Sequence, residues 1–232
     1  MTSSGVTRRV PSKTQALDTL KSRGVPIGAI VDVGIERGTP ELIEAFSHLD
    51  HILFEPVQEF APFIAEAYRT VRHVLIPKAV SDQDGEAVIA VSSVMGTEVT
   101  HSAIVDDHEV IPGRRRVEMT TIDTALDALS LTEPYLLKID IDGQELKVLA
   151  GAARTLERCS VVIVEVPIYE FGARLVAMER AGFTLFDLAE PCYYDGALWQ
   201  CDAIFVRNDI KRDFFENLHD GFDPEKYQMF KG

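Results

Sequence analysis

The stretch GAIVDVGIERGTP, residues 28–40, decides the fold of this chain. Its first half is an apolar run rich in β-branched residues, which is typical of a buried strand. Gly34 and Gly38 interrupt the run, and Thr39 and Pro40 suit the N-cap and the first position of a helix. The stretch therefore predicts a strand, a glycine turn and a helix, which together begin a βαβ unit.

The same alternation continues on both sides of this stretch. Ser12 and Gln15 form a capping-box pair that predicts a helix ending near Gly24. Strands alternating with helices favour an α/β fold with a mostly parallel sheet, in which ligands bind beyond the carboxyl ends of the strands. We expect further strands at 51–55, 71–78, 86–93, 135–140 and 160–167, helices at 58–68, 144–158 and 171–181, and a final antiparallel pair at 184–188 and 199–206.

One segment breaks the rhythm. Residues 94–115 show no clear period, which predicts an irregular loop or small insertion on the substrate side. We therefore expect a tail and short helix over 1–25, the main domain over 26–208 and a C-terminal tail over 209–232. The aromatic residues of that last tail would suit packing on its own domain, over the cleft, or against a second copy of the chain.

Charge and composition exclude several classes of protein. The 37 acidic residues outnumber the 23 basic ones and give a net charge of −14, which disfavours binding to nucleic acid or to an anionic membrane surface. No apolar run reaches the roughly 18 residues that a membrane span needs. Cys159, Cys192 and Cys201 lack the spacing of a zinc site or a disulfide framework. We therefore expect a cytoplasmic enzyme that acts on a small molecule.

The first candidate site lies at the glycine turn. Asp32, Gly34 and Gly38 are followed by Glu55, 23 positions after Asp32, at the end of the next strand. An acid at that place can accept hydrogen bonds from both hydroxyls of a ribose. The turn lacks the G-x-G-x-x-G pattern of dinucleotide binders, so S-adenosylmethionine fits better than NAD. The alternative is that the glycines only shape a tight turn.

The second candidate site is the stretch LLKIDIDGQE, residues 136–145. Ionisable residues that follow a buried strand are costly unless they are paired or functional. Asp140 or Asp142 could hold an acceptor hydroxyl or take its proton, and Asp140 could bind a divalent cation together with Glu165. The alternative is that Lys138 pairs with a neighbouring acid and that Glu145 is a solvated helix residue.

Three weaker candidates lie elsewhere. His101, with Ser102, could serve as a base over the cleft, although a histidine in a polar loop is more often only exposed to solvent. The three arginines at 114–116 could grip an anion, although a short charge run is usually a solvated edge. Ser81 and Asp82 could contact an adenine ring, or could form an ordinary capped turn.

Taken in order, these segments resemble the FkbM-type S-adenosylmethionine-dependent methyltransferases. The resemblance runs from about residue 17 to 206, through VDVGIERGT, LFEP, KAVSD, TIDTAL, LLKIDIDGQELKVLAGA and VVIVEVP. It implies a Rossmann-like class I methyltransferase fold, with a seven-stranded, mostly parallel sheet whose last strand is antiparallel. It also implies methyl transfer to oxygen, commonly a hydroxyl of a sugar or natural product.

The resemblance also implies roles for individual residues. The turn would hold the methionine part of the cofactor, the next strand end the ribose, the third strand end the adenine, and the fourth strand end would face the acceptor. The match is poorest over 94–115 and after 208, so the acceptor does not transfer. The residues concerned are Asp32, Gly34, Arg37 and Gly38 for methionine, Glu55 for ribose, Ser81 and Asp82 for adenine, and Asp140 and Asp142 for the acceptor.

Methyl transfer is an in-line displacement in which the protein mainly aligns the reactants. A hydroxyl acceptor also needs a base, for which Asp140 or Asp142 is the first choice. The acidic balance would suit a cationic acceptor such as an amino sugar, and the target could then be nitrogen. Rival interpretations are a metal-dependent glycosyltransferase that uses the D-x-D of IDIDG, a nicotinamide-dependent oxidoreductase, and a binding protein without catalysis.

Overall fold

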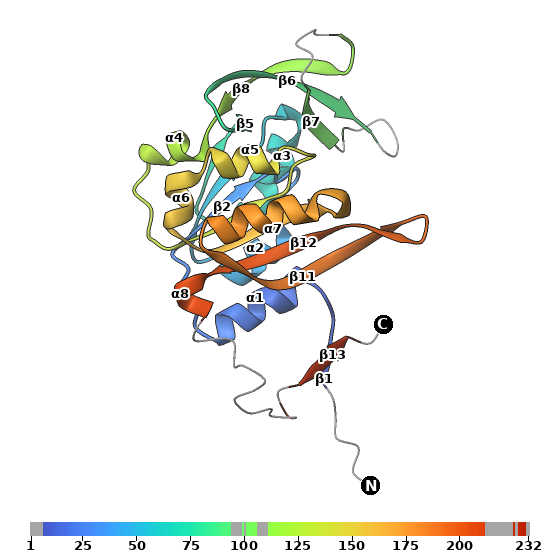
Figure 1. Ribbon diagram of the computed structural model, residues 1–232. Coiled ribbons are helices and arrows are strands. Elements are labelled where there is room, and N and C mark those ends of the chain that lie inside the picture. The colour runs from blue at the N-terminus through green and yellow to red at the C-terminus, as the bar shows by residue number, and fades with distance from the viewer. Residues whose placement is uncertain are drawn as a thin grey trace.

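The computed structural model describes residues 7–93, 99, 101–105, 111–211, 225 and 227–230. Its main sheet has seven strands in the order β11-β12-β10-β9-β2-β3-β4 (Figure 1). β12 runs antiparallel to both of its neighbours, while the other neighbouring pairs are parallel. The expected α/β sheet with an antiparallel last strand is therefore confirmed. The strands are β2 (Ala29–Val33), β3 (Asp50–Phe54), β4 (His73–Ile76), β9 (Tyr135–Ile139), β10 (Cys159–Pro167), β11 (Phe183–Tyr194) and β12 (Ala197–Arg207).

Helices cover both faces of this sheet, and each face has its own apolar core. On one face lie α4 (Ile122–Asp127), α5 (Glu145–Ala150), α6 (Ala153–Glu157) and α7 (Phe171–Arg180). On the other lie α1 (Lys13–Ser22), α2 (Pro40–Phe46) and the short α8 (Asn208–Lys211). Because side chains alternate along a strand, Val31 and Val33 of β2 join the first core, and Asp32 points to the α1 and α2 side.

The predicted helix starts are found with two changes in their bonding. Ser12 caps α1 by accepting a bond of 3.2 Å from the amide of Gln15. The Gln15 side chain, however, accepts from the amide of Val10 and not from that of Ser12. Gly24 follows α1 with φ of 71°, the left-handed conformation in which glycine is favoured. Thr39 precedes α2, but its side chain makes no capping bond.

The helix predicted over 144–158 is two helices, α5 and α6, which are separated by Gly151 and Ala152. A Cβ added at Gly151 would lie 2.2 Å from the carbonyl oxygen of Ser81. The break therefore falls where the segment after β5 (Ala79–Val80) comes closest to the helical layer. A continuous helical period could not reveal this contact, because Ser81 lies 70 residues earlier in the sequence.

A second sheet of four strands stands at the top of Figure 1, in the order β5-β8-β6-β7. It contains β6 (Gly85–Ser92), β7 (His101–Val105) and β8 (Arg114–Thr120). The prediction of irregular structure over 94–115 was therefore wrong for 101–105 and 114–115. These residues form strands because they pair with β6. Such pairing between strands leaves no clear hydrophobic period in the sequence. Residues 94–98, 100 and 106–110 lie outside the described part.

A helix segment connects this small sheet to the main one. The 3₁₀ turn η1 (Gln58–Phe60) and α3 (Ala61–Ala67) follow β3, as predicted for a helix over 58–68. Their apolar residues pack with Ile35 of the glycine turn and with Ile89 of β6. The glycine turn is therefore held between α3 and the small sheet.

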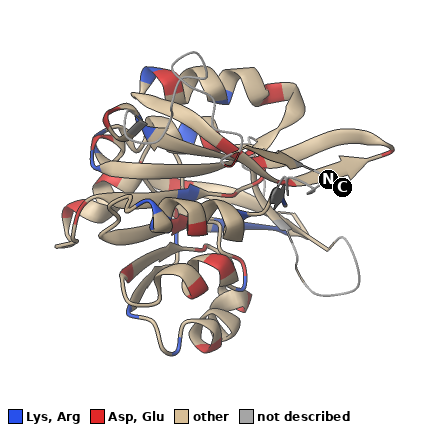
Figure 2. Ribbon diagram, turned by 90° about the horizontal axis from the view of Figure 1, so that it is seen from below, with Lys and Arg blue, Asp and Glu red and all other residues tan. Residues whose placement is uncertain are grey.

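The strands β1 and β13 lie below the main body in Figure 1. β1 (Thr7–Arg9) pairs in parallel with β13 (Gln228–Phe230), and Arg9 forms an ion pair with Asp187 of β11. Residues 212–224 of the predicted C-terminal tail lie outside the described residues. In the described ranges, no helix is long and apolar enough to cross a membrane. Figure 2 shows acidic and basic segments interspersed over the helices.

Candidate active site

A cavity of about 580 Å³ opens at the carboxyl ends of β2, β3, β9 and β10. Small-molecule sites commonly have volumes of about 300–1,000 Å³, and in α/β sheets they lie at these strand ends. Both candidate sites from the sequence line this one cavity. The residues concerned are Gly34, Gly38 and Glu55 from the first, and Lys138, Asp140, Asp142, Glu145 and Glu165 from the second.

Glu55 follows β3 and is buried at one end of the cavity. Its Oε1 accepts a bond of 2.8 Å from the amide of Val57, and its Oε2 accepts one of 3.0 Å from the amide of Glu36. Burial raises the pKa of Glu55 to about 7, although the two amide bonds oppose the increase. Each carboxylate oxygen has a second lone pair, so Glu55 can still accept hydrogen bonds from a ligand.

The glycine turn brings two strand ends together. A Cβ at Gly34 would lie 1.9 Å from the carbonyl oxygen of Asp140, and φ at Gly34 is 77°. Glycine is therefore required here because the end of β9 approaches so closely. This explains Gly34 as a residue that shapes a tight turn, which was the alternative interpretation. Glu36 is also left-handed, with φ of 49°, and this directs its amide to Glu55. Gly38 has φ of 129° and lies against Ala67 of α3.

A buried lysine joins the two candidate sites. Lys138 Nζ lies 3.5 Å from Asp32 Oδ1 and 2.9 Å from Asp140 Oδ2. Asp32 is 0% exposed, and burial raises its pKa against the opposing effect of Lys138. For Asp140, burial also acts to raise the pKa, but Lys138 outweighs it and the pKa is lowered. The alternative that Lys138 pairs with neighbouring acids is thus confirmed, and Asp140 is an anion at the cavity wall.

Glu165 behaves differently from Asp140. It lines the same cavity and accepts a hydrogen bond from the neutral side-chain amide of Gln200. Burial, together with the nearby carboxylates of Asp140, Asp202 and Asp142, raises the pKa of Glu165 to about 8. The two acids therefore differ in protonation near neutral pH, which is the arrangement that assigns different roles to carboxylates in one site.

Glu145 is not the solvated helix residue that the alternative interpretation expected. It is buried and forms an ion pair with Arg174 of α7, which also donates to Glu170 at 2.6 Å. Glu145 Oε1 also accepts a hydrogen bond of 3.1 Å from the amide of Gly143. Arg174 is itself fully buried, so the pair ties α5 to α7 behind the cavity.

Several predicted residues do not line the cavity. The Arg37 guanidinium lies 4.4 Å from the ring centre of Phe63, outside the cavity wall. Ser81 is buried against Gly151, and neither it nor Asp82 lines the cavity, whereas the preceding Ala79 and Val80 do. The roles proposed for Arg37, Ser81 and Asp82 stay predictions.

The remaining weak candidates lie on the small sheet. His101 begins β7, but its side chain lies outside the described residues, while Ser102 lines the cavity. Arg115 forms an ion pair with Glu59, and Arg116 forms one with Glu86, on exposed surface. Arg115 and Arg116 are thus engaged in surface pairs, and the solvated-edge alternative describes these two residues better.

Other cavity residues were missed in the sequence. Lys13 of α1 places its Nζ 3.0 Å from Glu41 Oε1 and 2.9 Å from Asp202 Oδ2. Tyr169 of the 3₁₀ turn η2 (Ile168–Glu170) and Trp199 of β12 also line the cavity. Their only sequence signal is residue type, because the chain folds back over long distances to bring them here.

Asp140 and Glu165 do not fit the predicted divalent cation. Within the described ranges, no three His, Cys, Asp or Glu side chains are arranged to hold a metal. The ammonium of Lys138 already lies 2.9 Å from Asp140 and would repel a cation there.

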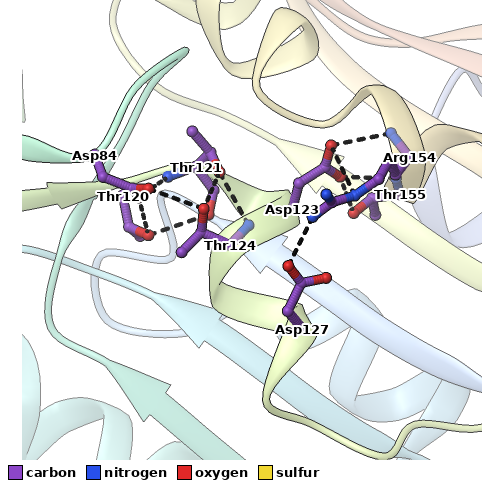
Figure 3. A network of polar contacts seen from close by, with 8 residues as sticks. All are labelled: Asp84, Thr120, Thr121, Asp123, Thr124, Asp127, Arg154 and Thr155. Atoms are coloured by element: carbon purple, nitrogen blue, oxygen red, sulfur yellow. Dashed lines mark hydrogen bonds and ion pairs between the residues drawn. The ribbon is translucent and has the colours of Figure 1, made fainter.

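One of the motifs that carry the family resemblance, TIDTAL at 121–126, has a structural role (Figure 3). Asp84 accepts bonds of 2.9–3.0 Å from Thr120 Oγ1, the Thr121 amide and Thr124 Oγ1 at the start of α4. Asp123 accepts from the amides of Arg154 and Thr155 at 3.0 and 2.8 Å, which caps α6. The TIDTAL motif thus joins the small sheet and two helices, away from the cavity.

The chain is similar in fold to several solved methyltransferases. A precorrin-6y C5,15-methyltransferase of Geobacter metallireducens is 9% identical, with 87% of this chain and 92% of that chain covered and a TM-score of 0.46. An rRNA methylase of Streptococcus thermophilus is 11% identical, with 83% of this chain and 94% of that chain covered and a TM-score of 0.47. A magnesium protoporphyrin IX methyltransferase of Synechocystis with bound SAM is 9% identical, with 84% of this chain and 79% of that chain covered and a TM-score of 0.44.

Family membership rests on the sequence itself. No curated protein matches the chain significantly. The profile of the Methyltransferase FkbM domain, however, matches residues 31–185. This range begins inside β2 and ends inside β11, so it includes the glycine turn and the four strand ends that form the cavity. The match spans most of the chain, which therefore belongs to the FkbM methyltransferase family.

Proposed function

We propose that this protein transfers the methyl group of S-adenosylmethionine to a hydroxyl oxygen of a small acceptor, such as a sugar or natural product. The observation that carries the proposal is a single cavity with Glu55 at one end and the carboxylates of Asp140 and Glu165 at the other. A nucleoside-bearing donor and an acceptor can therefore meet in one cavity. The family match supports methyl transfer over the glycosyltransferase and oxidoreductase alternatives.

The cofactor end has the chemistry that S-adenosylmethionine requires. Glu55 would accept the ribose hydroxyls, and the turn over residues 34–38 would lie along the methionine part. Phe60, Val80 and Ile89 give the same end an apolar wall that suits an adenine ring. When bound, the cofactor supplies a methyl group that its sulfonium has already activated, so the protein needs chiefly to align the acceptor.

The structure favours Glu165 as the base. An aliphatic hydroxyl is a poor nucleophile until its proton is removed, and a base works best when its pKa lies near the working pH. Asp140 is a weak base because Lys138 stabilises its ionised form, whereas burial raises the pKa of Glu165 to about 8. The ionised form of Glu165 would take the hydroxyl proton as the new oxygen–carbon bond forms and the bond between the methyl group and sulfur breaks. Asp140 and Asp142 would orient the acceptor.

An amine acceptor is the second candidate. The same carboxylates would attract an ammonium, and Glu165 could remove its proton before transfer to nitrogen. The two reactions differ only in the atom that receives the methyl group. Mass spectrometry of the product from an acceptor that carries both groups would distinguish them.

The test separates cofactor binding from turnover. Calorimetry with S-adenosylhomocysteine measures the first, and a labelled-methyl assay over hydroxyl and amine acceptors measures the second. Changing Glu165 to Gln, Asp140 to Asn or Asp142 to Asn should lower turnover while the affinity for S-adenosylhomocysteine stays nearly constant. Failure of the folded wild-type chain to bind S-adenosylhomocysteine would refute the proposal.

A further inference from the structure

Two aromatic rings stand exposed in the wall of the cavity. Tyr169 is 78% exposed and Trp199 is 52% exposed, yet both line the space into which the acceptor carboxylates project. They come from different elements, η2 and β12, which pack against each other. Tyr194 supports Trp199 from the opposite strand of the hairpin, with 6.2 Å between the ring centres. Large exposed rings that line a cavity indicate a surface that a ligand covers.

The same end of the cavity carries more negative than positive charge. Lys138 lies between two acids, Asp32 and Asp140, and Lys13 likewise lies between Glu41 and Asp202. Each of these lysines therefore neutralises only one of its two neighbours. No positive charge within these two ion-pair groups remains for the other carboxylates of the cavity.

Two further acids lie nearest the acceptor. Asp142 and Glu165 line the cavity, and Glu165, whose pKa is about 8, is largely protonated at neutral pH and receives its hydrogen bond from Gln200, an uncharged side chain. A neutral acceptor would leave the excess negative charge uncompensated, whereas a cation would reduce the repulsion among these acids. The raised pKa of Glu165 has the same cause, since Asp140, Asp202 and Asp142 add to the effect of burial.

Aromatic faces combined with carboxylates are the usual recognition chemistry for an ammonium group. We propose, on the basis of the proposed methyl transfer, that the acceptor carries a protonated amine, which sits against Tyr169 and Trp199 within the field of Asp140 and Asp142. The amine anchors the molecule while it stays protonated. A hydroxyl of the same molecule then lies at Glu165 and receives the methyl group. The substrate class is therefore a hydroxylated amine, such as an amino sugar.

Trp199 makes a direct test feasible because it is the only tryptophan in the chain. The full-length protein, saturated with S-adenosylhomocysteine, is titrated with cyclohexylamine, which is a cation at neutral pH. A parallel titration uses cyclohexanol, its neutral counterpart of the same shape. The fluorescence of Trp199 should change saturably with the amine, and the alcohol should bind at least about tenfold more weakly.

Variants then connect that preference to the named groups. Asp142→Asn should weaken binding of cyclohexylamine about tenfold, and Tyr169→Leu about threefold, while binding of cyclohexanol changes little. Glu179→Gln is the matched control, because it removes one negative charge from an exposed position of α7 outside the cavity. It should leave both titrations unchanged.

The outcomes separate this inference from the proposed function. Equal binding of amine and alcohol, or no binding of either, would overturn the cationic acceptor even when S-adenosylhomocysteine binds normally. An Asp142→Asn effect no larger than that of Glu179→Gln would also overturn it. Loss of S-adenosylhomocysteine binding in the folded wild-type chain would instead count against methyl transfer, and calorimetry reads this separately from fluorescence.

Discussion

Replacing Glu165 by Gln should make the protein more stable and less active. The ordinary pKa of this side chain is 4.5, and the folded protein raises it to about 8. Between these two pH values the folded state keeps a proton that the unfolded chain releases, so the carboxyl group lowers the free energy of unfolding as the pH rises. Glutamine does not titrate, and its side-chain oxygen can still accept the bond from Gln200.

The size of the gain follows from the same pKa values. At about pH 7 the effect spans roughly 2.5 pH units, and at about 1.36 kcal/mol per unit the upper bound is ~3 kcal/mol. Glu165 is only partly buried, so solvent screening reduces the expected gain to about 2 kcal/mol. For a chain of this length, that gain raises the melting temperature by about 4–8 °C. Loss of Glu165 as the proposed base should slow methyl transfer by about 10²- to 10⁴-fold.

Thermal unfolding over a range of pH tests the argument. The difference in melting temperature between Glu165→Gln and wild type should be near zero below pH 4.5, grow as the pH rises and become constant above about 8. Glu179→Gln, at an exposed site, should show no such growth. A Glu165 variant that is less stable than wild type at neutral pH would refute the reasoning, as would a gain that does not depend on pH.

Three further changes test other parts of the structure. Glu55→Gln should weaken binding of S-adenosylhomocysteine by about 10- to 100-fold, and the wild-type affinity should rise as the pH passes about 7, where Glu55 ionises. Calorimetry that shows a flat pH profile for wild type would contradict this. Gly34→Ala should cost about 3 kcal/mol or more, because its Cβ would strike a carbonyl oxygen at 1.9 Å, whereas Gly24→Ala, also left-handed but in open space, should cost about 1 kcal/mol. Equal melting temperatures for the two variants would refute the packing argument. Asp123→Ala should lose about 1–2 kcal/mol with the cap of α6, while the turnover of the folded fraction stays constant, which a labelled-methyl assay would check.

The sequence predicted the strand ends well. The apolar runs that form β3 and β9 each stop at an acidic residue, and parallel strands place their carboxyl ends at one edge of a sheet. Glu55 and Asp140 could therefore be assigned to one site before their contacts were known, and both line the cavity. Ser81 also follows a strand, but it does not line the cavity. The carbonyl oxygen of Ser81 faces Gly151, which lies 70 residues later in the sequence. No local sequence pattern can predict this contact.

Residues that reach the cavity from outside the strand ends had no local signal. Lys13 lies at the start of α1, and its sequence context indicates only a helix N-terminus. Trp199 belongs to a hairpin whose strands extend beyond the predicted residues 184–188 and 199–206. The extra length carries Trp199 to the cavity mouth. Strand length depends on pairing with the neighbouring strand, so hydrophobic period alone does not determine it.

The D-x-G and LLKID motifs, separate in the sequence, form one ion-paired unit. The sheet register sets Asp32 of β2 directly beside Lys138 of β9, and Lys138 also reaches Asp140. A fully buried carboxylate such as Asp32 is costly without a partner, so its ion pair with Lys138 offsets the cost of burial. Lys138 in turn keeps Asp140 ionised at the cavity wall. Asp32 is thus linked to Asp140 through a shared lysine, and the two candidate sites are electrostatically coupled.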